Sequence, residues 1–219
     1  NRIPVARGLG SSAAAIVAGL MAADAFMGIA PDLQRLLNTA ARIEGHPDNT
    51  AACILGGITA SSSVGARVLW ARVPAHGSLR AVVAVPDFPV STRAARNVLP
   101  GNVPHSDAVF NVGRTALLVA SLASGNYANL RYAFDDRLHQ PYRSGLVPGM
   151  VNAMKAACDA GAIGSYMSGA GPSIMALIGG DGPAEPVALA MREAFARARV
   201  NADTMVLPMA ESGALVEVI

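Results

Sequence analysis

The sequence predicts an α+β protein in which helices pack against one face of a mostly antiparallel sheet. Two observations support this fold class. Short apolar runs with strand character come in neighbouring pairs, and longer runs with apolar residues at helical spacing stand between the pairs. Hydrophobic residues make up 52% of the 219 residues and charged residues 15%, so the chain can bury a sizeable core.

The first part of the chain is predicted to be mainly helical. A strand tail at 3–5 precedes a helix that Ser11 or Ser12 caps and that runs to about Met27, with Gly28 after it. The remaining elements expected here are a helix that Asp32 opens and Gly45 ends, a turn at 46–49, a short helix to Leu55, and two strands at 58–63 and 67–73 joined at Gly65.

The second part alternates strands and helices. Pro74 to Ser78 is a plausible boundary, which gives expected domains of 1–76 and 77–219. The expected strands are 79–85, 163–167, 173–178 and 203–207, and the expected helices are 91–98, 107–123, 127–134, 146–160 and 185–199. The helix at 107–123 carries one apolar face, formed by Val109, Val112, Ala116, Val119 and Ala120.

Composition excludes several classes of function. A formal net charge of +2 is too weak to indicate nucleic acid or a membrane surface as the partner. Cys53 and Cys158 form neither a disulfide framework nor a metal motif, which suits a reducing, cytoplasmic compartment. The apolar stretch 13–30 is interrupted by Asp24 and rich in Ala and Gly, so it predicts a buried helix and no membrane span.

A glycine-rich turn, GLGSSAAA, leads into the first helix. Gly8 and Gly10 allow a ligand to approach the backbone closely, and the free N–H groups at a helix start favour an anion such as phosphate. No Lys follows, so this is not the Walker pattern. The alternative is a helix start whose glycines serve packing alone.

Two further motifs carry polar or glycine-rich chemistry. IEGHPDN places His46, Asp48 and Asn49 in one turn, which suits polar groups around a reacting hydroxyl, although solvated turns also use these residues. SGAGPS, with Gly169 and Gly171, lies between two predicted strands and could reach a phosphate or the first glycine loop. A plain hairpin is the alternative.

Arginines supply the candidate carboxylate ligands. Arg96 lies in STRAARNVLP and Arg143 in DRLHQPYR, and guanidinium groups suit bidentate binding of a carboxylate. Most arginines are surface residues, and Arg7, Arg93 and Arg137 compete with these two for the role.

The three motifs in this order resemble the GHMP small-molecule kinases. EGHPDN followed by Gly-Gly, together with STRAARNVLP, FNVGRTALL and DRLHQPYR, is similar to the homoserine kinase branch of that superfamily. The resemblance covers essentially the whole chain. It implies an N-terminal part like the second domain of ribosomal protein S5, incomplete here, and a ferredoxin-like C-terminal domain.

The resemblance also implies ATP-dependent phosphorylation of the L-homoserine hydroxyl, with Mg²⁺ as cofactor. Asn49 would hold the hydroxyl, with His46 and Asp48 beside it, and Ser12 would reach the metal. Thr92, Arg96 and Arg143 would bind the amino-acid end of the substrate. The residues implied for the nucleotide phosphates are Arg7, Gly8, Leu9, Gly10, Ser11, Ser12, Ala13, Gly169 and Gly171. A homodimer is left open.

Two departures from the family pattern stand out. Relatives often carry a magnesium-binding Glu eight residues before the histidine of EGHPDN, where this chain has Asn38. Glu44 is nearer but is expected on a different helix face, so no metal carboxylate is assigned. The family's first motif lies upstream of the phosphate loop and is absent, so we expect a truncated kinase. The alternatives are another GHMP kinase with a different small alcohol, or a non-catalytic member or inactive fragment.

Overall fold

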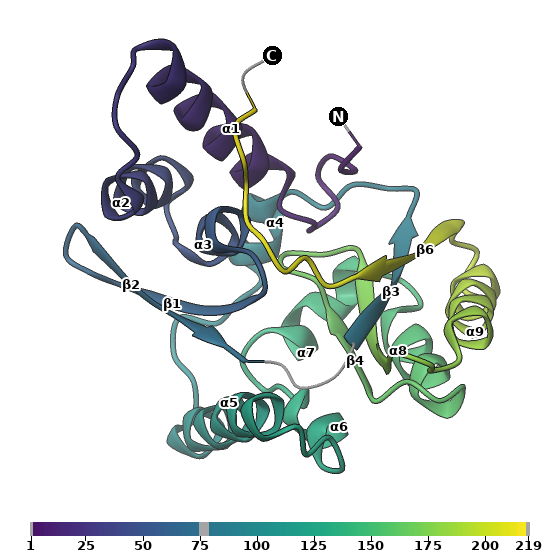
Figure 1. Ribbon diagram of the computed structural model, residues 1–219. Helices are drawn as coiled ribbons and strands as arrows, with labels where there is room; N and C mark the ends of the chain where they lie inside the picture. The colour runs from purple at the N-terminus through teal and green to yellow at the C-terminus, as the bar shows by residue number, and fades with distance from the viewer. Residues whose placement is uncertain (1, 75–78, 218–219) are drawn as a thin grey trace. The chain divides into compact units, whose positions relative to one another are not determined.

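The computed structural model describes residues 2–74 and 79–217 (Figure 1). These residues form two compact units. The larger unit takes its residues from 1–9 and 75–209, and the smaller from 10–74 and 210–219. The domain boundary expected between residues 76 and 77 lies outside the described residues.

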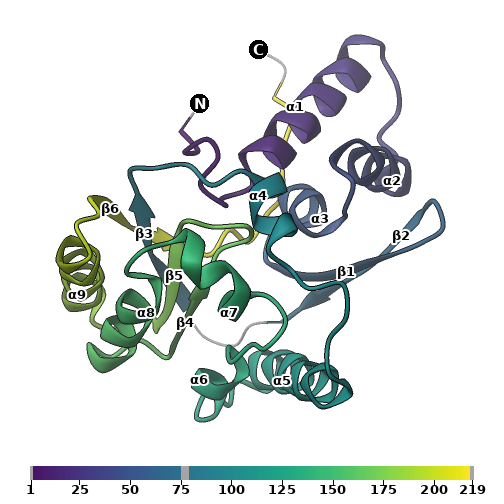
Figure 2. The same cartoon turned by 180° about the vertical axis from the view of Figure 1, so that it is seen from behind.

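The larger unit is built on a four-stranded antiparallel sheet in the order β4-β5-β3-β6. The strands are β3 (Leu79–Pro86), β4 (Gly164–Met167), β5 (Ile174–Gly179) and β6 (Ala202–Pro208). Helix α8 (Met150–Asp159) lies between β3 and β4, and α9 (Ala184–Arg197) lies between β5 and β6. Both helices cover one face of the sheet (Figures 1 and 2), so the arrangement is the predicted ferredoxin-like one.

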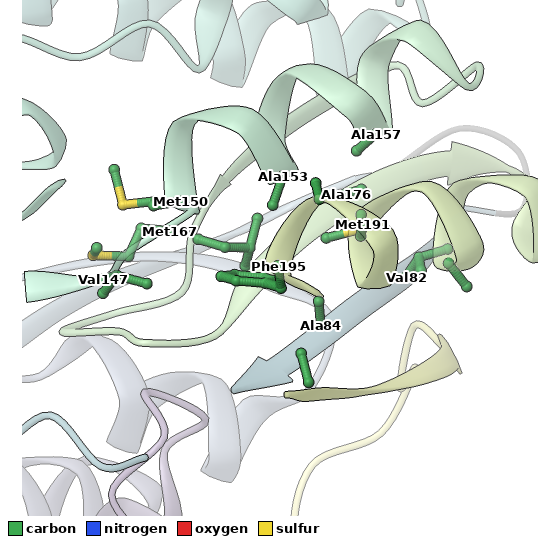
Figure 3. Close-up of a cluster of buried hydrophobic side chains, with 14 of the residues drawn as sticks. Val82, Ala84, Val147, Met150, Ala153, Ala157, Met167, Ala176, Met191 and Phe195 are labelled. Carbon is green, nitrogen blue, oxygen red and sulfur yellow. The ribbon is translucent and has the colours of Figure 1, made fainter. Parts of the chain in front are cut away.

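The core of this unit lies between the sheet and the two helices. Strand residues alternate between the two faces, so Val82 and Ala84 of β3 point to the same side as Ala176 of β5. Phe195 and Met191 of α9 fill the space above them and are fully buried (Figure 3). The continuous apolar run of β3 fits its position as a central strand, because β5 and β6 pair with it on both sides.

A helical insertion separates β3 from α8. It contains α4 (Thr92–Asn97), α5 (His105–Ser124), α6 (Leu130–Ala133), α7 (Gln140–Arg143) and the 3-10 turn η1 (Ser144–Leu146). The helix expected at 146–160 is therefore wrong at its start: a 3-10 turn ends at Leu146, and the helix begins at Met150, after Gly149 at φ 86°.

The apolar face of α5 is exposed. Val109 and Val112 are 57% and 70% exposed, and the buried residues of the helix are Ser121 and Leu122. The opposite, polar side makes the contacts instead, since Asp107 and Asn111 bind Arg137 and Asp136. Apolar spacing predicted the helix correctly but not which side of it packs within the unit.

The smaller unit packs helices on a hairpin. Its elements are α1 (Ser11–Phe26), α2 (Leu33–Glu44), α3 (Asp48–Leu55), β1 (Ile58–Val64) and β2 (Arg67–Val73). The strands β1 and β2 pair in the register Ile58 to Val73, which confirms the predicted hairpin. Val17, Leu37, Ala40 and Ile54 of the three helices meet Val68 of β2 in the core.

The residues after β6 contribute to this same unit. The N–H of Gly57 donates to the carbonyl of Ala210, and the N–H of Ala214 donates to that of Cys53. A side chain at Gly56 would collide with the backbone of Ser212 at 2.3 Å. The missing side chain of Gly56 therefore lets the C-terminal segment approach the backbone at the end of α3.

Three local expectations need correction. Residues 3–5 form no strand: Pro4 lacks an N–H group, and the chain turns at Val5 and Ala6. Gly10, and neither Ser11 nor Ser12, occupies the N-cap of α1. Asp48 and Asn49 lie in the first turn of α3, because Pro47 pre-sets helical backbone at the cap.

Among the described residues, none of the helices is both long enough and apolar enough for a membrane crossing. The stretch at 13–30 forms α1 and the turn that follows it. The expectation of a buried helix is wrong, because α1, which is described over its whole length, buries only Ala13 and Val17, and Phe26 is 94% exposed.

Candidate functional site

The start of α1 has the geometry of an anion site. Gly8 and Gly10 have φ of 75° and 72°, a left-handed conformation that favours glycine. The first N–H groups of a helix have no acceptor within the helix, and no side chain caps those of α1. Together with the helix dipole, these free donors attract a negatively charged group such as phosphate.

The two glycine loops contact each other within the larger unit. The hydroxyl of Ser168 donates to the carbonyl of Gly8 at 2.8 Å. A Cβ atom on Gly8 would lie 2.2 Å from the carbonyl oxygen of Ser168, and one on Gly169 would lie 3.1 Å from that of Gly8. Glycine is therefore required where the loops meet, and the predicted approach of SGAGPS to the first loop is present.

Arg7 is held by the protein itself. Its guanidinium donates to the backbone carbonyls of Pro86, Asp87 and Val5. The side chain thus anchors the chain ahead of the glycine loop beside the end of β3, and only the backbone of Arg7 stays a candidate phosphate contact.

Ser12 and Glu44 meet in the smaller unit. The Ser12 hydroxyl donates to Oε2 of Glu44 at 2.7 Å. Glu44 is the last residue of α2, which packs on α1, so it reaches the start of α1 although it lies on a different face of α2 from Asn38. Sequence reasoning set Glu44 aside, although its place directly before the GHPDN turn was a usable signal.

Asn38 has a structural role in the smaller unit. Its Oδ1 accepts from the N–H of Val68 in β2 at 2.8 Å and from the side chain of Gln34 at 2.9 Å. The amide therefore fastens α2 to the hairpin, and its oxygen is already occupied.

His46, Asp48 and Asn49 form a connected polar group. Nδ1 of His46 and Oδ1 of Asp48 are in hydrogen-bond contact, and the same oxygen accepts from the N–H of Asn49. Asp48 is 71% exposed on its side chain, whereas His46 is 26% exposed. A carboxylate on Nδ1 fixes the orientation of the imidazole. The side chain of Asn49 lies next to Gly10, 3.6 Å from the place of a Cβ there.

The larger unit brings two arginines into electrostatic range of each other. Nε of Arg143 donates to the carbonyl of Ala95, and Nη1 donates to that of Gly169. Burial lowers the pKa of Arg143, a nearby Asp136 raises it, and the positive charge of Arg96 lowers it further. Positive charges within electrostatic range repel each other, and a bound carboxylate would relieve that repulsion.

Thr92 and Arg96 stand on the same side of α4. The helix begins at Thr92 because the hydroxyl of Ser91 accepts from the N–H of Ala94, as predicted for this cap. Residues four positions apart face the same way on a helix, so Thr92 and Arg96 are neighbours, and both are exposed. Ala95, between them in sequence, is buried and supplies the carbonyl that holds Arg143.

Comparisons with known proteins give the family. The profile of the GHMP kinases N terminal domain matches residues 1–57, and that of the GHMP kinases C terminal matches 117–197. Homoserine kinase from Desulfitobacterium hafniense is 44% identical over 99% of this chain and 72% of its own length. The chain belongs to the homoserine kinase family. Homoserine kinase from Moorella thermoacetica is likewise 44% identical over 99% of this chain and 72% of its own length.

A solved homoserine kinase structure shares the fold. The enzyme from Cytophaga hutchinsonii superposes with a TM-score of 0.89 at 32% identity, covering 97% of this chain and 69% of the other. Homoserine kinases are thus similar to this chain through both units, and the expected GHMP kinase fold is confirmed.

In this chain, the side chains of Ser12 and Glu44 fit a magnesium ion. Mg²⁺ prefers hard oxygen ligands, binds through one or two carboxylates, and completes its shell with water and phosphate oxygens. The Glu44 carboxylate and the Ser12 hydroxyl offer such a donor set, already in contact beside the helix start.

Proposed function

We propose that this protein transfers the terminal phosphate of ATP to the side-chain hydroxyl of L-homoserine, giving O-phospho-L-homoserine for threonine biosynthesis. The match to homoserine kinases over 99% of the chain carries this proposal. The paired arginines support it separately, because an amino-acid acceptor needs a carboxylate ligand, whereas a sugar or simple alcohol does not.

Most of the catalysis in phosphoryl transfer is alignment and charge neutralisation. In the proposal, the backbone N–H groups from Gly8 to Ala13 bind the ATP phosphates. The loop at 168–171 supports the start of this run, because it contacts the backbone of Gly8. Ser12 and Glu44 would hold Mg²⁺, which neutralises phosphate charge when bound.

The proposal assigns residues separately to the hydroxyl and to the amino-acid end of the acceptor. Asn49, next to Gly10, positions the hydroxyl, and His46 assists. Arg96 and Arg143 take the carboxylate, with Thr92 beside them. Asp48 is a supporting residue, since it is mostly exposed and its carboxylate is already in contact with His46 and the N–H of Asn49.

A spectrophotometric assay that couples ADP release to NADH oxidation tests the proposal. The purified protein, expressed from its complete gene, is given ATP, Mg²⁺ and one of L-homoserine, mevalonate or galactose. We expect kcat/KM for L-homoserine to exceed the other two by at least ~10²-fold, the discrimination that polar recognition of a substrate group supplies. A preference for mevalonate or galactose would instead assign another alcohol.

The role of Asp48 has its own test. Without a dedicated base, the hydroxyl proton passes to the phosphate, so Asp48→Asn should lower kcat by much less than ~10³-fold, a loss within the range that a general base contributes. The variant keeps a side-chain oxygen that can accept from the N–H of Asn49. A loss of ~10³-fold or more at unchanged KM would make Asp48 the base.

A further inference from the structure

Arg143 belongs to a segment that folds around one carboxylate. Asp136 lies just before α7, and its Oδ2 accepts from the N–H groups of His139 at 2.9 Å and Gln140 at 2.5 Å. Its Oδ1 accepts from the N–H of Leu138 at 2.7 Å. The carboxylate thus holds the start of the short helix whose last residue is Arg143.

Helix α5 fixes that carboxylate from the other side. Nδ2 of Asn111 donates to Oδ1 of Asp136 at 2.7 Å, and Oδ1 of Asn111 accepts from the N–H of Arg137 at 2.9 Å. Asn111 therefore binds both the carboxylate and the backbone beside it. Helix α5 has 20 residues, so its hydrogen-bonded backbone supports the irregular segment from Asp136 to the start of α7.

Gln140 ties the other side of α7 to the sheet. Its Oε1 accepts from the N–H of Met167, the last residue of β4, and its Nε2 donates to the carbonyl of Phe134. Met167 leads directly into the loop whose Gly169 carbonyl binds Arg143. The arginine and the loop it contacts are thus held in a common frame.

The charge of Asp136 fits this arrangement. Burial raises the pKa of its half-buried carboxyl, but hydrogen bonds from Gln140, Asn111 and Leu138 outweigh burial, and the pKa is lowered. Asp136 also stabilises the positive charge of Arg143 against the repulsion of Arg96.

We propose that Asp136 is a positioning residue for substrate recognition: with Asn111 it holds α7 so that Arg143 presents its guanidinium to the carboxylate of the amino-acid acceptor. The inference rests on the proposed function for the identity of that acceptor. Asp136 itself need not touch the substrate, because every hydrogen bond described for it goes to Asn111 or to the segment that carries Arg143.

Steady-state kinetics with two acceptors test the proposal. The acceptors are L-homoserine and 3-amino-1-propanol, which is homoserine without its carboxylate. Asp136→Ala should raise KM for L-homoserine by about 10- to 100-fold, the range expected when a hydrogen bond to a charged group is lost or misplaced. KM for ATP and kcat/KM for 3-amino-1-propanol should change less than about twofold. A uniform loss on both acceptors would overturn the proposal.

Two further variants separate positioning from general damage. Asp136→Asn keeps one oxygen acceptor, which can still cap α7, so it should recover part of the homoserine affinity that Asp136→Ala loses. In the background of Arg143→Ala, Asp136→Ala should add almost nothing to KM, because residues that act through each other are not additive. Additive effects would mean that Asp136 acts independently of Arg143.

Amide hydrogen exchange decides the inference without any turnover. In Asp136→Ala, the Arg143 N–H, bonded to the carbonyl of His139, should exchange at least tenfold faster, while α9 stays protected. Unchanged protection would overturn the proposal. If the wild-type protein does not phosphorylate L-homoserine, the proposed function fails, and this measurement still shows whether Asp136 holds the segment.

Discussion

The contact between the two glycine loops depends on the missing side chain of Gly8 and on the hydroxyl of Ser168. Gly8 sits where any side chain would enter the backbone of Ser168, and its φ of 75° disfavours other residues as well. The hydroxyl of Ser168 then fixes the carbonyl of Gly8. The backbone at Gly8 therefore has little room to move without breaking the contact with Ser168.

A matched pair of glycine variants tests this point. Gly8→Ala should destabilise the protein and raise KM for ATP at least tenfold, because the backbone must move to admit the Cβ. Gly28 has φ of 65° but open space around it, so Gly28→Ala should cost only about 1–2 kcal/mol of backbone strain and leave KM unchanged. If Gly8→Ala and Gly28→Ala changed the free energy of unfolding in urea and KM for ATP by equal amounts, the contact between the loops would be unimportant.

The contact between Ser12 and Glu44 leads to a second prediction at this scale. Glu44→Gln removes a charged ligand but keeps an acceptor for the Ser12 hydroxyl, so the half-saturating Mg²⁺ concentration should rise at least tenfold at saturating ATP. Glu193→Gln, an exposed change on α9, is the control. A Mg²⁺ dependence like that of the wild type would remove Glu44 from the metal site.

At the scale of elements, patterning predicted most helices and strands, because apolar spacing and turn residues are local signals. The hairpin of β1 and β2, the central strand β3 and the cap at Ser91 follow from such signals. The exposed apolar side of α5 does not, since spacing shows that a helix has a face but not what covers it.

The site residues also divide into those that local motifs predict and those that tertiary contacts bring together. Gly8, Gly10, His46 and Asn49 lie in compact motifs, so their grouping could be predicted. Glu44 was left out of the predicted site because the contact between the end of α2 and the start of α1 is a tertiary feature. Asp136 was missed for a similar reason, since its partner Asn111 lies 25 positions away in the sequence.

Helix α9 gives a stability prediction for an element. Phe195 is fully buried between α9 and the sheet, so Phe195→Ala should lower the free energy of unfolding by about 3–5 kcal/mol. Leu189 on the same helix is 47% exposed, and Leu189→Ala should change it by less than about 1 kcal/mol. Urea denaturation measures both values, and similar losses would contradict the burial of this helix.

The lowered pKa of Asp136 predicts a pH dependence of the segment it caps. A carboxyl whose pKa falls on folding stabilises the native state above its unfolded pKa. That contribution is lost as the pH falls through the lower folded value. Below about pH 4, the ordinary range of a carboxyl, the wild type should therefore lose its stability advantage over Asp136→Asn. Acid unfolding followed by circular dichroism checks this, and parallel curves for the two proteins would contradict it.

At the scale of the molecule, each unit contains a distinct set of the residues proposed for the site. The smaller unit holds the helix start, the Ser12 and Glu44 pair and the polar group around Asn49. The larger unit holds SGAGPS and the two arginines. The first glycine loop belongs to both, because the division between the units falls between Leu9 and Gly10.

The central claim is phosphoryl transfer to the hydroxyl of L-homoserine, and phosphorus NMR of the reaction mixture tests it most directly. With ATP, Mg²⁺ and L-homoserine, the purified protein should produce ADP and a phosphomonoester that matches O-phospho-L-homoserine, in equal amounts. ADP with inorganic phosphate and no phosphomonoester, or no consumption of ATP, would contradict the account.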